Sequence, residues 1–185
     1  DGLLQAGFAP CDGGYMAVNW CRPLAEMART FRTWVEEPGP QAMVEASVFL
    51  DFRRVHGDLS VDPLQQILLD ARHRPLFLAG LARSAGSFEP PLGLLGRVRT
   101  QDGLLDLKHS ALVAIVIMGR IFALEAGSPA RGTVARLEAA AAANVITARR
   151  AKELADIFSF LIRLRLGEQL RQHEAGSTPD NRIRL

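Results

Sequence analysis

The stretch Val48-Phe49-Leu50-Asp51-Phe52-Arg53-Arg54-Val55-His56-Gly57-Asp58 divides this chain into two parts of different character. Aromatic and branched residues over 46–54 predict a β-strand, and a single carboxylate stands among its apolar neighbours. Because an unpaired buried carboxylate costs several kcal/mol, we expect Asp51 to be paired, hydrogen-bonded or bound to a metal. The alternative is a solvated strand face for Asp51, with its apolar neighbours turned toward the core.

Before this stretch the chain has a mixed pattern. Residues 15–18 predict a short strand, and Pro23 is well placed to begin a helix that runs to about Glu36. The apolar residues of that helix follow helical spacing, and Pro38-Gly39-Pro40 ends it. Residues 41–45 are compatible with one further helical turn.

After residue 59 the pattern is helical almost throughout. The predicted helices cover 63–71, 75–84, 106–126, 133–143 and 148–173. A connector rich in glycine and proline spans 86–103, and its length indicates a functional loop. Thr147 is the expected N-cap of the last helix.

These patterns predict an α+β fold that is mostly α. Residues 1–58 form a small remnant of a sheet-containing domain, and residues 59–185 form a helical bundle. The chain begins without Met and stops without an obvious terminal element, so we expect it to be a piece of a longer protein.

Composition excludes several classes of protein. Hydrophobic residues make up 48% of the 185 residues and charged residues 23%, which is typical of a globular protein rather than a disordered one. Two cysteines without a secretory signal predict reduced thiols and a cytoplasmic location. The longest charge-free apolar run is too short to cross a bilayer.

Several cations accompany Asp51 as candidate phosphate-binding residues. Arg53, Arg54 and His56 follow it directly, and they suit either phosphate recognition or a solvated edge. Lys108 lies in the first turn of a predicted helix, where a cation opposes the helix dipole unless an anion is bound nearby. Simple exposure of Lys108 is the alternative.

Arg120 lies deep in the same apolar helix and requires a partner if it is buried. Glu125, Glu153, Asp156 or a ligand are the expected partners. The arginines of the last helix suggest nucleic acid only weakly, because no basic face interleaved with aromatic residues accompanies them. We therefore expect neither nucleic acid nor a membrane as a partner.

Taken together, several segments carry a resemblance to one family. They are Cys11-Asp12-Gly13-Gly14-Tyr15-Met16-Ala17-Val18-Asn19-Trp20, Phe49-Leu50-Asp51-Phe52-Arg53, Val55-His56-Gly57-Asp58, Pro90-Pro91-Leu92-Gly93-Leu94-Leu95-Gly96-Arg97, Leu105-Asp106-Leu107-Lys108 and Phe160-Leu161-Ile162-Arg163-Leu164-Arg165. The chain resembles the nucleotidyltransferases of bacterial signal-transduction proteins that carry cyclic-nucleotide-binding and CBS domains. That family is related to the PII-protein uridylyltransferases and the glutamine synthetase adenylyltransferases.

The resemblance implies different roles for the two parts of the chain. Residues 1–58 would be the C-terminal remnant of a polymerase-β-like nucleotidyltransferase domain, and residues 59–185 the helical substrate-binding domain. Asp51 would be a catalytic carboxylate and a ligand of Mg²⁺, while Arg53, Arg97, Lys108 and Arg120 would bind the nucleotide or substrate. The family's metal pair, an Asp-x-Asp that follows a Gly-Ser turn, is absent from these 185 residues, so we expect the chain alone to be inactive.

Two functions follow as alternatives. In the first, the parent protein transfers a uridylyl or adenylyl group from a nucleoside triphosphate to an acceptor protein or small molecule, with Mg²⁺ as cofactor. In the second, the helices form a non-catalytic interaction or regulatory module. The open edge of the predicted strand over 46–54 also predicts a homo-oligomer.

Overall fold

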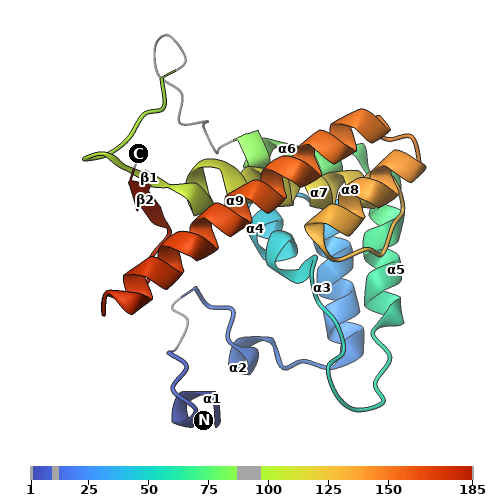
Figure 1. Cartoon of the computed structure of the whole chain (residues 1–185). Coiled ribbons are helices and arrows are strands. Elements are labelled where there is room, and N and C mark those ends of the chain that lie inside the picture. The colour runs from blue at the N-terminus through green and yellow to red at the C-terminus, as the bar shows by residue number, and fades with distance from the viewer. Residues whose placement is uncertain (1, 10–12, 87–96, 185) are drawn as a thin grey trace.

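The computed structural model describes residues 2–9, 13–86 and 97–184 and is mainly helical (Figure 1). The elements of the first half are α1 (Gly2–Gln5), α2 (Ala17–Trp20), α3 (Leu24–Glu36), α4 (Pro40–Phe49), α5 (Asp62–Asp70), the 3₁₀ turn η1 (Ala71–His73) and α6 (Pro75–Gly86). The elements of the second half are β1 (Leu104–Asp106), the π-helical turn η3 (Lys108–Leu112), α7 (Val113–Glu125), α8 (Thr133–Ala142), α9 (Ala148–Glu174) and β2 (Arg182–Arg184). This confirms the predicted fold class, which is mostly α.

Helix α3 shows why the periodic segments fold as predicted. Its buried residues recur at helical spacing along one face: Met27, Ala28, Phe31, Trp34 and Val35. The helix follows Pro23 and ends just before Pro38, which cannot continue it. The buried face of α3 packs against α4 and α5.

The predicted strand over 46–54 is wrong. Residues 40–49 form helix α4, and the amide N–H of Leu50 donates to the carbonyl of Ala46 at 3.0 Å. Pro40 occupies the first turn, and Met43 and Ala46 lie three residues apart on the buried face. The branched residues Val44 and Val48, which favoured a strand, are instead exposed on the other side of the helix.

The predicted strand at 15–18 is also wrong, because Ala17–Trp20 is a short helix. Within the described part of residues 1–58 there is no strand, so the expected sheet remnant is not found there. The sheet of this structure pairs β1 with β2 in antiparallel register, with Leu105 opposite Ile183. The argument for a homo-oligomer relied on an open strand edge at 46–54, and no strand is found there. The homo-oligomer therefore stays a prediction without that support.

One hydrophobic core joins the two halves of the described chain. Its buried residues come from both sides of residue 58: Met27, Ala28, Phe31, Trp34, Val35, Met43, Ala46, Leu64, Leu68, Ala71, Phe77, Leu81 and Leu124. The division at 58/59 stays a prediction, since burial in a shared core does not by itself define family boundaries.

The C-terminal helices form a layer in which α8 packs between α7 and α9. Figure 1 shows α9 as the long orange helix that runs across α7 and α8. Thr147 caps α9 as predicted, since its side chain accepts a hydrogen bond from the N–H of Arg150 at 3.2 Å. No helix among the described residues is both long and apolar enough to cross a membrane.

The strand β2 returns the end of the chain to the start of the α7 segment. The N–H of Leu107 donates to the carbonyl of Asn181 at 3.0 Å, and Arg165 of α9 donates to the Asn181 side chain at 2.7 Å. The predicted connector over 86–103 lies partly outside the described residues, since 87–96 are not described.

Candidate functional site

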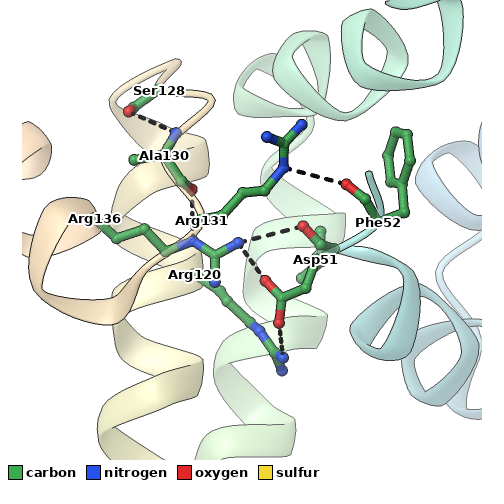
Figure 2. A network of polar contacts seen from close by, with 8 residues as sticks. Asp51, Phe52, Arg120, Ser128, Ala130, Arg131 and Arg136 are labelled. Carbon is green, nitrogen blue, oxygen red and sulfur yellow. Dashed lines mark hydrogen bonds and ion pairs between the residues drawn. The ribbon is translucent and has the colours of Figure 1, made fainter. Parts of the chain in front are cut away.

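Asp51 lies in the turn that ends helix α4. The N–H of Phe52 donates to the carbonyl of Phe49 at 3.3 Å, which closes this turn. The turn carries the Asp51 side chain toward α7 and α8, where two arginines reach it (Figure 2). A residue expected on a strand therefore lies at a junction of three helices.

Both oxygens of the Asp51 carboxylate accept hydrogen bonds from arginine. Arg120 of α7 donates to Oδ2, and Arg136 of α8 donates to Oδ1 at 2.5 Å. The same Arg136 nitrogen also reaches the carbonyl of Leu50 at 3.3 Å, and its Nε donates to the carbonyl of Ala130 at 2.8 Å. These contacts fasten the end of α4 to α7 and α8.

The three side chains differ in their exposure. Arg136 is 5% exposed and Arg120 19%, whereas Asp51 keeps 40% of its side chain accessible. From the sequence we correctly expected a buried Arg120 to have a partner, but that partner is not Glu125, Glu153 or Asp156. The partner is Asp51, which is 69 residues earlier in the chain.

The local charges set the ionisation of Asp51. Partial burial raises the pKa of its carboxyl, but hydrogen bonds and charge from Arg120, together with those from Arg136, outweigh burial and hold the pKa below its ordinary value. For Arg136, burial lowers the pKa of the guanidinium, and the charges of Arg120 and Arg131 lower it further, while Asp51 opposes this. The cations therefore repel one another across the site.

A pH prediction follows from the lowered pKa of Asp51. A carboxyl with a depressed folded-state pKa contributes stability above its unfolded pKa of about 3.9, and this contribution is lost as pH falls toward the folded value. We expect the difference in unfolding free energy between wild type and Asp51→Asn to be constant from neutral pH to about 5 and to shrink below about 4. Urea unfolding of both proteins at each pH measures it. A difference that grows in acid would contradict the prediction.

A third arginine completes the cluster. Arg131 lies in the loop between α7 and α8, and its Nε donates to the carbonyl of Phe52 at 3.3 Å. We call Arg120, Arg131 and Arg136 the arginine cluster. A small pocket lies beside Arg131 and is lined in part by Phe52, Gln65 and Ser128.

Arg131 and Arg136 were missed in the sequence. A signal for Arg136 was present, because it stands four residues before Ala140, which is buried on the inner face of α8. Its polarity on an apolar face of a helix indicates a buried ion pair. Arg131 gives no such signal, since it lies in a loop between glycine and alanine.

The other predicted binding residues do not join this cluster. Arg53, Arg97 and Lys108 are exposed, and none forms an ion pair within the described part of the chain. Lys108 precedes Arg120 by twelve residues, a separation of roughly 18 Å along a helix. The structure thus brings together Asp51 and Arg120 from the predicted set, and the roles of the other residues stay predictions.

The surroundings of Asp51 do not fit a magnesium ion. Both of its oxygens are taken by guanidinium groups, and the closest charged side chains are cations. Over residues 2–9, 13–86 and 97–184 no three side chains of His, Cys, Asp or Glu gather as a metal site. Mg²⁺ prefers carboxylate and water oxygens, which this cluster does not offer. Asp51 as a metal ligand stays a prediction of the resemblance.

Comparison with known proteins identifies the family. Residues 1–41 match the family described as "Putative nucleotidyltransferase DUF294", and residues 75–185 match the one described as "Putative nucleotidyltransferase substrate binding domain". Searches of the curated proteins and of the solved structures gave no significant match. Because the second match alone covers more than half of the chain, this protein belongs to the nucleotidyltransferase substrate-binding domain family.

Proposed function

We propose that this chain is the substrate-binding part of a Mg²⁺-dependent nucleotidyltransferase of bacterial signal transduction. The parent protein would transfer a uridylyl or adenylyl group from a nucleoside triphosphate to an acceptor protein or small molecule in the cytoplasm. The family match over 75–185 carries this proposal, because it assigns substrate binding to the helical part of the chain. The match over 1–41 supports an adjoining nucleotidyltransferase region.

The residues of the chain suit binding rather than metal chemistry. A metal-assisted transfer needs several carboxylates that hold the ion, and the 185 residues contain no Asp-x-Asp pair. The arginine cluster instead supplies guanidinium groups, which recognise phosphate oxygens through paired hydrogen bonds. In this proposal the helices hold and orient a phosphate-bearing substrate, and carboxylates elsewhere in the parent supply the metal site.

A nucleotide titration of the chain tests the proposed function. We expect saturable binding of ATP or UTP by calorimetry and no release of pyrophosphate in the presence of Mg²⁺. Binding is expected because the cluster offers cationic donors, and turnover is not expected because the metal carboxylates are missing. Pyrophosphate release by the chain alone, or no saturable binding of either nucleotide at millimolar concentration, would contradict the proposal.

A second candidate function is a protein-interaction module. Helix α9 exposes a series of large apolar side chains: Ile157, Phe160, Ile162, Leu166 and Leu170. Exposed apolar surface of this kind is typical of a contact with another protein. Light scattering at high concentration tests whether the contact is a second copy of the chain, since a monomer would exclude the homo-oligomer.

A further inference from the structure

The arginine cluster carries more positive charge than its surroundings neutralise. Arg120, Arg131 and Arg136 all reach the segment 50–52, and Asp51 is the one carboxylate that pairs with them among the described residues. Arg136 is almost fully buried, so water screens its charge weakly. A site with an excess of cations at the edge of a protein interior favours an anion as a ligand.

The cluster also holds one buried donor that lacks an acceptor. The Nε of Arg120 is buried and has no hydrogen-bond partner within the described chain. Such an atom is uncommon in a folded protein, and it leaves the cluster with a cationic donor that no acceptor among the described residues satisfies, although Arg120 itself does not line the pocket beside Arg131. Figure 2 shows that the terminal nitrogens of Arg131 point away from Asp51, while its Nε is bonded to the carbonyl of Phe52.

Asp51 divides the cluster into two roles. Its carboxylate fixes the guanidinium groups of Arg120 and Arg136, and Arg136 is held further by the carbonyls of Leu50 and Ala130. Arg131 is not paired with Asp51 and is exposed. The two terminal amino groups of Arg131 are therefore available to a ligand. The hydrogen bonds of Arg136 to Ala130, Leu50 and Asp51 hold the loop that carries Arg131 in position.

The pocket beside Arg131 gives a ligand further polar contacts. Its lining includes Phe52, Gln65 and Ser128 beside Arg131, and its other residues are mostly apolar. The amide of Gln65 and the hydroxyl of Ser128 both donate hydrogen bonds, and phosphate oxygens accept them. Arginine with such neutral donors is a common arrangement for binding phosphate.

From these observations we propose that Arg131, supported by Arg120 and Arg136, binds a phosphate group at the pocket between α5 and the α7–α8 loop. The ligand is a phosphate ester or polyphosphate, either the nucleotide or a phosphorylated acceptor. This inference rests on the proposed function, because it locates the phosphate-bearing substrate of that same binding domain. It assigns Asp51 to positioning the arginines and not to holding a metal.

Calorimetric titration with inorganic tripolyphosphate tests this site. The measurement is made at fixed ionic strength with a chelator present, so that neither salt nor metal changes between variants. We expect Arg131→Gln to weaken binding about tenfold or more, as the loss of a charge-assisted hydrogen-bonding group does. Arg131→Lys keeps the charge but loses the planar fork, and is expected to recover part of the affinity.

Arg163→Gln is the matched control. Arg163 is exposed on α9, so this variant removes the same charge from a position outside the α7–α8 loop. Its affinity for tripolyphosphate is expected to stay within about twofold of wild type, since Arg163 does not line the pocket and an exposed charge is screened. Equal losses of tripolyphosphate affinity in Arg131→Gln and Arg163→Gln would mean that the effect comes from net charge alone, and would overturn the proposed site.

Competition experiments separate the two sources of the phosphate. If ATP or UTP displaces tripolyphosphate and glycerol 3-phosphate does not, the ligand is the nucleotide, and the reverse result indicates a phosphorylated acceptor. Unchanged tripolyphosphate binding by Arg131→Gln overturns this site. In that case saturable ATP or UTP binding by the wild-type chain would still support the proposed function, so the two failures are distinguishable.

Discussion

Replacing Phe31 by alanine is expected to lower the free energy of unfolding by about 3–5 kcal/mol, the range for a large aromatic residue in a packed core. Phe31 is fully buried in α3. Its ring lies 4.8 Å from that of Trp34, 5.9 Å from Phe49 and 5.5 Å from Phe52, measured between centroids. The substitution therefore leaves a cavity that the turn carrying Asp51 borders directly.

Equilibrium unfolding in urea measures this loss, and Phe8→Ala is the matched control. Phe8 is 64% exposed, so the same change in chemistry is expected to cost less than about 0.5 kcal/mol there. Because Phe49 and Phe52 flank Asp51 in sequence, Phe31→Ala is also expected to loosen the arginine cluster. Similar losses in the two variants would mean that this core does not stabilise the fold as described.

Replacing Asp51 by asparagine is expected to destabilise the protein by about 2–3 kcal/mol. Breaking a fully buried ion pair costs about 3–5 kcal/mol, and the partial exposure of Asp51 lowers that figure through solvent screening. The cost arises from Arg136. Its side chain is only 5% exposed, and in this variant it loses its counter-charge. The asparagine amide replaces one of the two carboxylate oxygens by an NH2 group, which would face a guanidinium donor, so it cannot reproduce both hydrogen bonds of Asp51.

Asp58→Asn is the control for this second prediction, because Asp58 is exposed in the same loop and the variant has the same net charge. Its stability is expected to match wild type within about 0.5 kcal/mol. A double-mutant cycle with Arg136→Gln isolates the pair, and a coupling energy of about 1 kcal/mol or more is expected for residues in direct contact. If Asp51→Asn were neutral for stability but abolished Mg²⁺ binding by the chain, the metal assignment would regain support over the ion pair.

The helices that the sequence predicted best are those whose apolar residues repeat over several turns. In α3 the buried residues recur at helical spacing, and Pro23 before α3 and Thr147 before α9 mark where each helix starts. The prediction failed for α4 because its apolar residues are not confined to one face: Val44 and Val48 are exposed, while Met43 and Ala46 are buried. Val44, Val48 and Phe49 have high strand propensity, and packing against α3 and α6 outweighed it.

The candidate site was predicted in part. That Asp51 and a buried Arg120 each needed a partner was evident from polarity in apolar surroundings. The sequence did not show that Asp51 and Arg120 are partners of each other, because 69 residues separate them and nothing local encodes the contact. The strand β2 was not predicted for the same reason, because its partner strand β1 lies more than seventy residues earlier.

By itself, therefore, the sequence determined a mostly helical chain, most of its helix limits, its family resemblance and the need to pair two charged groups. Local periodicity, proline and capping residues act over a few turns, and short-range interactions suffice to specify them. The tertiary structure alone decided that the helix begun at 40–45 continues through residue 49 and that three arginines meet the segment 50–52. Those outcomes depend on contacts between distant segments, because only packing brings a buried cation and its counter-charge to the same place.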